Sequence, residues 1–201
     1  MQQTVNRKLR LGLSCLTLSG IITKNNDLYN EAKKHLLKLV ETVDETAHLA
    51  ILDDHVVTYL LQEECNHPVR ILNHVGRKNP IHATSSGKVM LAFQSEEVQE
   101  AFLKQELKPM TSNTITSPEQ FRTHLQMVRK QGYACDFNEH SEGVVSVSAP
   151  IRNYLGLVSS AVTIVGPVQR MEESKIAYYV KHVIATADAI SEKIGYMPKR
   201  K

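Results

Sequence analysis

Residues 80–88, Pro-Ile-His-Ala-Thr-Ser-Ser-Gly-Lys, are the part of the sequence whose residue types most clearly suggest a binding site. An extended segment there runs into small hydroxyl residues and a glycine, and then into a helix. The free N–H groups at a helix start attract anions, and small residues let a ligand approach the backbone. The same residues could equally form a helix cap with nothing bound. The stretch is not a Walker motif, because the leading glycine and its spacing are missing.

A second group of polar residues lies in the last third of the chain. Asp136 follows a short predicted strand, and Ser146 and Ser148 share one face of the next strand. The Asp136 carboxylate could accept a hydrogen bond from a ligand hydroxyl, or it could only stabilise a turn. Thr163 and Val165, near the end of the last predicted strand, could face the same place.

Catalytic and metal-binding patterns are weak in this sequence. Cys135 lies beside Asp136 with His140 downstream, but this spacing does not establish the hydrogen-bonded geometry of a cysteine nucleophile and its base. His82, Asp136 and His140 could converge on a metal, although none has a ligand partner at i, i+4. We therefore predict no enzyme activity and no cofactor, and leave open whether a metal lies near these three side chains.

Helices and short strands must position these groups. Apolar periodicity and capping residues predict helices over about residues 6–23, 28–43, 84–93, after Ser95, and over 118–131 and 171–194. Alternating patterns predict strands over 46–52, 56–64, 69–74, 133–136, 144–151 and 157–165, with 80–83 extended. Several of these strands follow one another as hairpins, so the sheet should be largely antiparallel with helices covering it. This order indicates the α+β class.

Length, composition and charge narrow the function classes. A chain of 201 residues can form one domain, or one domain with an appendage. It has no apolar run long enough for a membrane span and no secretory signal pattern. Its three cysteines are far apart, which favours a reducing, cytoplasmic location over a disulfide framework. The net charge of +3 comes from three cations near each end, and the rest of the chain is mildly acidic. That distribution argues against nucleic-acid binding by this chain itself.

Several segments together resemble a known family. They are Arg10-Leu11-Gly12-Leu13, residues 42–53, 80–92 and 132–143, Ser148-Ala149-Pro150-Ile151, and Gly166-Pro167. Their order and spacing closely resemble the effector-binding domain of IclR-type bacterial transcriptional regulators, from about residue 10 to residue 195.

The resemblance implies an overall organisation. It implies a GAF/PAS-like fold, with a curved antiparallel sheet flanked by helices and an N-terminal linker helix. Residues 1–23 would be the linker helix from a winged helix-turn-helix domain that this chain lacks, and residues 24–201 would be the effector-binding domain. The partners implied are a small-molecule effector and other copies of the chain, as a dimer or tetramer. DNA would be contacted only through the missing domain, and no membrane is involved.

The resemblance also implies a pocket. By motif position its ligand-binding residues are Ile71, Ser85, Ser86, Asp136, Val144, Ser146, Thr163 and Val165. Some relatives have Gly-Ala in place of Ser85-Ser86, so the ligand of this chain can differ from theirs. A small hydroxy, keto or sugar acid would suit this pocket, because its carboxylate could lie at the helix start and its hydroxyl groups could face Asp136. Two alternatives remain: an enzyme that uses the same pocket, and a purely oligomerising module with a dry, filled interior.

Overall fold

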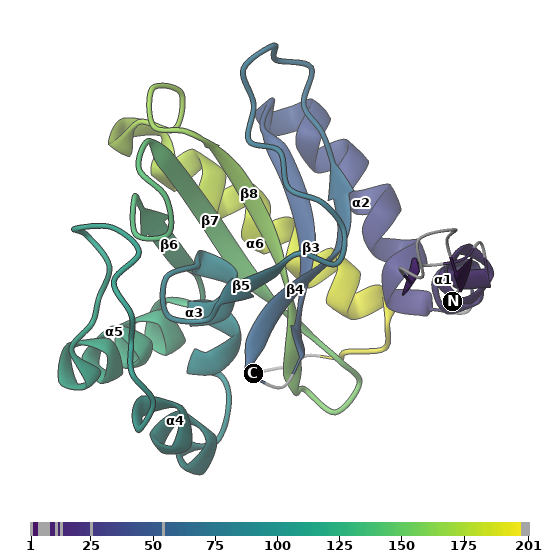
Figure 1. Cartoon of the computed structure of the whole chain (residues 1–201). Coiled ribbons are helices and arrows are strands. Elements are labelled where there is room, and N and C mark those ends of the chain that lie inside the picture. The colour runs from purple at the N-terminus through teal and green to yellow at the C-terminus, as the bar shows by residue number, and fades with distance from the viewer. Residues whose placement is uncertain are drawn as a thin grey trace.

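An antiparallel sheet of six strands, curled into half a barrel, forms the centre of the fold (Figure 1). The computed structural model describes residues 2–3, 9–10, 12, 14–24, 26–53 and 55–197. Across the sheet the strands are β5 (Lys78–Pro80), β4 (Val56–Glu63), β3 (Thr46–Asp53), β8 (Val158–Pro167), β7 (Val144–Arg152) and β6 (Ala134–Phe137). All neighbouring pairs are antiparallel, so the predicted α+β class and sheet type are confirmed.

Helices cover both faces of this sheet. On one face lie α2 (Asp27–Val43) and α6 (Glu173–Lys193), which pack on each other and on the strands. On the other face lies α3 (Ser85–Ala92), flanked by α4 (Glu96–Leu103) and α5 (Pro118–Gln131) (Figure 1). The remaining described helix, α1 (Ser14–Lys24), has few contacts and touches α2. No helix among the described residues is both long and apolar enough to cross a membrane.

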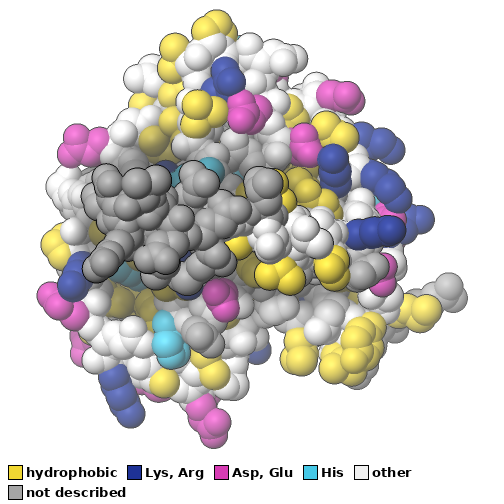
Figure 2. All heavy atoms as spheres, turned by 45° about the vertical axis from the view of Figure 1, so that its right-hand side comes forward, with side chains coloured by type: hydrophobic (Ala, Val, Ile, Leu, Met, Phe, Trp, Pro, Cys, Tyr) yellow, Lys and Arg dark blue, Asp and Glu magenta, His cyan; other side chains and the backbone are white. Residues whose placement is uncertain are grey.

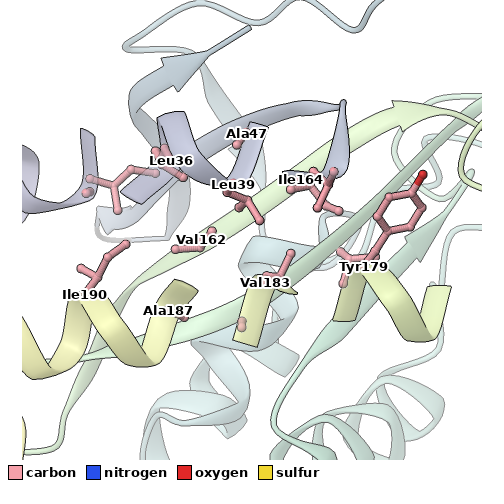
Figure 3. Close-up of a cluster of buried hydrophobic side chains, with 14 of the residues drawn as sticks. Leu36, Leu39, Ala47, Val162, Ile164, Tyr179, Val183, Ala187 and Ile190 are labelled. Carbon is pink, nitrogen blue, oxygen red and sulfur yellow. The ribbon is translucent and has the colours of Figure 1, made fainter. Parts of the chain in front are cut away.

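The pleat of each strand divides the interior into two hydrophobic clusters. Ala47 and Leu49 of β3 point toward α2 and α6, whereas Ala50 points toward α3. Figure 3 shows the first cluster, in which Leu36 and Leu39 of α2 and side chains of α6 gather beside Ala47, Val162 and Ile164 of the sheet. Because side chains alternate along a strand, the polar residues between these apolar ones are directed to the α3 face. The candidate site lies there.

Local signals fix α3 closely. Thr84 is its N-cap, and its hydroxyl accepts a hydrogen bond from Gly87 N at 3.2 Å, as the sequence predicts. A Cβ at Gly87 would collide with the backbone of Ile81, so only glycine allows this helix to pack on the preceding turn. All eight helical residues are buried, which places Ser85 and Ser86 in the interior.

Two predicted elements are wrong in part. The helix predicted from residue 6 begins at Ser14, because residues Leu9–Arg10 form a short strand, β2, paired with β1 (Gln2–Gln3). Gly12, a poor helix former, separates this pair from the helix. Residues 6–8, 11 and 13 of that prediction lie outside the described part of the chain.

The strand predicted over residues 69–74 is a loop. The edge of β4 is occupied instead by β5, in which Val56 pairs with Pro80 and Thr58 with Lys78. The extended segment predicted over 80–83 is a turn after Pro80. The loop ends in a turn closed by a hydrogen bond from Arg77 N to His74 O at 3.0 Å. This loop carries part of the candidate site.

Candidate functional site

A chain of buried hydroxyl groups joins α3 to the sheet. Ser85 Oγ lies 2.7 Å from both Ser146 Oγ and Ser148 Oγ, and Ser148 Oγ lies 2.6 Å from Thr163 Oγ1. The strand register produces this cluster, since Asp136 is opposite Ser146 and Ser148 is opposite Thr163. The four hydroxyl residues come from three elements, α3, β7 and β8, and the fold brings them together at the start of α3.

Asp136 stands at one end of the hydroxyl chain. Its Oδ1 accepts hydrogen bonds from Glu139 N at 2.7 Å and His140 N at 3.4 Å, and the Ser146 hydroxyl donates to Oδ2 at 3.5 Å. Burial raises the pKa of Asp136 from 3.8 to about 6, although the Glu139 N–H and the charge of Lys88 oppose this. The turn-stabilising role considered from the sequence is therefore seen at Oδ1, whereas Oδ2 accepts from the Ser146 hydroxyl beside the cavity.

A buried ion pair holds the turn that carries Asp136. Lys88 Nζ of α3 lies 2.5 Å from Glu139 Oε1, and the Lys88 side chain is completely buried. The hydroxyl of Thr114 donates to Glu139 O at 2.6 Å, and that of Thr111 donates to Asn138 O at 2.6 Å. This pair is not predicted from the sequence. The signal available in the sequence is a lysine within a helix whose other residues are apolar or small.

A cavity of about 70 Å³ opens beside Asp136. It is lined by Tyr59, Ile71, Leu72, Asn73, Arg77, Thr84, Asp136, His140, Ser141, Val144, Ser146 and Val165. Of the predicted ligand-binding residues, Ile71, Asp136, Val144, Ser146 and Val165 line this cavity directly.

The other three predicted residues lie behind the cavity wall. Ser85 and Thr163 belong to the hydroxyl chain. Ser86 is buried, and its hydroxyl has no hydrogen-bond partner among the described residues. An unpaired buried hydroxyl is costly unless a ligand or water satisfies it.

An aromatic and imidazole pair forms one side of the site. The rings of His48 and Tyr59 stack with centroids 4.5 Å apart. Burial lowers the pKa of His48 to about 4 and raises that of Tyr59 to about 12, so both are uncharged at neutral pH. The sequence reasoning did not select Tyr59. A register shift between Leu49 and Ala50 in the β3–β4 pairing changes the alternation there.

The residues considered from the sequence for a metal site or a cysteine nucleophile have other partners in the structure. His82 Nε2 lies 2.9 Å from Lys108 O, and His140 Nδ1 lies 3.1 Å from Ser141 Oγ. Over the described ranges, no three His, Cys, Asp or Glu side chains are grouped so that they could hold a metal. Cys135 packs against the cluster on the α2 and α6 face, away from the cavity, and burial raises its pKa to about 11.

Comparison with known proteins gives the family. The family model described as "Bacterial transcriptional regulator IclR C-terminal" matches residues 21–192. The transcriptional regulator KdgR of Dickeya chrysanthemi is 33% identical over 196 residues, which are 97% of this chain but 64% of that relative. This chain therefore spans less than two thirds of the length of that relative.

Solved structures agree with this assignment. The Thermotoga maritima IclR structure superimposes with a TM-score of 0.87 at 30% identity, covering 96% of this chain and 79% of that one. The inducer-binding domain of a PobR double mutant from Acinetobacter, in complex with 3-hydroxybenzoic acid, gives a TM-score of 0.74 at 28% identity. That match covers 80% of this chain and 95% of the PobR chain. The chain belongs to the IclR family of bacterial transcriptional regulators, and residues 21–192 correspond to the family's C-terminal domain.

Proposed function

We propose that this chain senses a small organic acid bearing hydroxyl groups, which it binds in the cavity beside Asp136. The observation that carries the proposal is the convergence of Ile71, Asp136, Val144, Ser146 and Val165, from separate segments, on one cavity. The carboxylate of Asp136 and the adjacent hydroxyls offer acceptors and donors for a hydroxylated ligand. The PobR domain supports this class, since its ligand, 3-hydroxybenzoic acid, carries one carboxyl and one hydroxyl group.

The proposal extends to the whole regulator. Residues 1–23 act as a linker to a DNA-binding domain, and residues 24–201 form the sensor, which assembles with other copies of itself in the cytoplasm. Effector binding changes the DNA affinity of the full-length protein only to the extent that the effector binds two conformations unequally. The larger hollow of about 530 Å³ between α4 and α5 is an open groove whose lining includes the exposed Glu100–Arg122 ion pair, and none of the predicted ligand residues line it.

A thermal-shift screen followed by calorimetry tests the sensor. The panel contains glycolate, lactate, glycerate, gluconate and 3-hydroxybenzoate. At 100 times the dissociation constant, binding adds about 2.7 kcal/mol, which for a domain of this size is a rise of about 5–11 °C in Tm. We expect one acid to bind with a stoichiometry of one per chain. No stabilisation by any acid of the panel would contradict the proposal.

Mass spectrometry of the recovered ligand separates the sensor from an enzyme. A sensor returns the acid unchanged after prolonged incubation, whereas an enzyme yields a new species. A module that only oligomerises would show neither binding nor product. It would leave the cavity beside Asp136 inaccessible to every acid in the panel.

A further inference from the structure

Arg77 lines the same cavity as Asp136 and Ser146 but was not among the ligand-binding residues predicted from the sequence. We propose that its guanidinium binds the carboxylate of the effector and so determines the specificity of the pocket for acids. This inference rests on the proposed function, because it assigns the acidic end of the same ligand. Arg77 lies in the loop between β4 and β5 and lines the cavity together with Asn73.

The backbone and side chain of Arg77 are both held in place. Tyr59 N donates to Arg77 O at 3.3 Å, and Gly76 N donates to Tyr59 O at 2.8 Å, so the turn is fastened to β4. The guanidinium donates from one Nη to Asn73 Oδ1 at 2.8 Å. A guanidinium has five N–H donors in a planar fork that matches a carboxylate. Holding it in position before binding lowers the entropy lost on binding.

The charge of Arg77 is not neutralised within the described part of the chain. Arg70, Arg122 and Arg170 each form an ion pair with a glutamate, but no acidic side chain there pairs with Arg77. His140, also on the cavity wall, does not add a competing cation. Burial lowers the pKa of His140 first, and the charges of Arg77 and His82 lower it further. A half-buried cation beside a cavity is therefore available for an anionic ligand.

The start of α3 is a weaker place for the carboxylate than the sequence indicated. The Ser85 hydroxyl is already engaged with two serine hydroxyls. Only the Ser146 hydroxyl separates Ser85 from the Asp136 carboxylate, which is ionised above pH 6 and repels a second carboxylate. A helix start also carries roughly half a unit of positive charge, compared with a full unit on arginine. The carboxylate at Arg77 instead leaves the ligand hydroxyls to face Asp136 and Ser146.

The size of the cavity sets the class of acid more narrowly. At about 10–15 Å³ per water-sized group, a cavity of about 70 Å³ has room for about five to seven such groups. Short hydroxy acids such as lactate or glycerate suit that volume. Longer acids require the part of the loop around Ile71 to move outward. Because residues 64–74 form no strand, such movement breaks no sheet pairing and leaves Arg77 fastened to Tyr59.

Calorimetry with matched acids and amides tests the role of Arg77. Each acid of the panel is compared with its neutral amide, for example glycerate with glyceramide, on the wild-type chain and on Arg77→Gln. We expect Arg77→Gln to weaken binding of the acid about 10- to 100-fold, the range of a charge-assisted hydrogen-bonded pair, and to leave the amide unchanged. Arg77→Lys should restore part of the preference for the acid.

A neighbouring variant controls for charge alone. Lys78→Gln removes one positive charge from an exposed side chain next in sequence, which lies near Asp53 and does not line the cavity. It should leave the ratio of acid to amide affinity unchanged. Equal affinity of acid and amide in the wild type, or an unchanged ratio in Arg77→Gln, would overturn this inference and leave the sensor proposal intact. Failure of every acid to bind the wild type would overturn both.

Discussion

At the scale of single residues, Asp136 is destabilising at neutral pH because of its burial. A carboxyl group whose pKa is raised on folding binds more protons in the folded state than in the unfolded state. Between pH 3.8 and about 6 this group therefore lowers the free energy of unfolding as the pH rises. Asp136 thus lowers stability through its burial, although its Oδ1 also holds the turn at Glu139.

Asp136→Asn should reverse this effect. The amide keeps an oxygen that can accept from Glu139 N but carries no charge at any pH. We expect the variant to be more stable than the wild type by about 1–3 kcal/mol at pH 7.5, with the difference disappearing below pH 4. Urea unfolding at several pH values measures it. A variant less stable than the wild type at pH 7.5 would contradict the expectation, and loss of effector binding should accompany the gain.

Lys88 and Glu139 form the buried ion pair whose disruption should lower the free energy of unfolding most. Lys88→Met leaves the Glu139 carboxylate in the interior without its cation. Removing one partner of a buried ion pair typically costs about 3–5 kcal/mol, and the turn that holds Asp136 should loosen. Lys104→Met, at an exposed position after α4, is the matched control and should change the free energy of unfolding by less than about 0.5 kcal/mol. Equal unfolding midpoints for the two variants in urea would disprove this role.

At the scale of elements, features fixed by neighbouring residues could be predicted from the sequence. The helix starts expected near residues 28, 84, 95 and 118 are capped by Asn26, Thr84, Ser95 and Ser117, and each side chain bonds a backbone N–H only three residues away. The strand expected over 69–74 is absent, because the choice of partner for the β4 edge depends on distant pairing. An apolar alternation alone cannot distinguish a strand from a loop that covers a cavity.

The same reasoning explains what could be predicted of the candidate site. Strand alternation is sufficient to place Ser146 and Ser148 on one face, and the register then brings Asp136 opposite Ser146. Tyr59 depends on a register shift that leaves no local signal, and Arg77 depends on how a long loop folds back onto β4. The residues that sequence patterns missed are those whose place depends on a register shift or on a long loop rather than on their immediate neighbours.

Gly166→Ala tests the contact between β8 and the loop before β3. A Cβ at Gly166 would lie 2.6 Å from Glu45 Cδ, and the Glu45 carboxylate is bound by both Nε and Nη2 of Arg170. We expect a loss of about 2–4 kcal/mol, since the added carbon must displace a buried ion pair. Gly20→Ala, in the exposed helix α1 with open space around it, should be neutral or slightly stabilising. Thermal unfolding compares the two, and similar melting temperatures would contradict the argument.

At the scale of the whole molecule, α1 differs from the other helices. Leu16, Leu18 and Ile21 are 70%, 62% and 55% exposed, whereas the apolar faces of α2 and α6 are buried against the sheet. Figure 2 shows one face of the molecule. Hydrophobic side chains reach the surface there at several separate places, and Lys and Arg side chains gather toward the right edge of the view. A helix with its large apolar residues in solvent contributes little to the stability of the domain beneath it.

Removal of residues 1–23 should therefore leave the sensor folded. Helix α2 does not depend on these residues, because Asn26 caps its start and its buried side chains belong to the hydrophobic cluster on the α2 and α6 face of the sheet. We expect the shortened chain to melt cooperatively within about 2 °C of the full chain, which corresponds to less than about 1 kcal/mol for a domain of this size. Its affinity for the acid that binds best should be unchanged, since no residue of the cavity lies before Tyr59. Calorimetric melting and titration of both chains measure these quantities.

A drop of more than 5 °C in Tm, or weaker binding by the shortened chain, would show that α1 belongs to the sensor rather than to a linker. Retention of both would place the boundary between linker and sensor close to residue 24, because the cavity and the hydrophobic cluster would then be complete without α1.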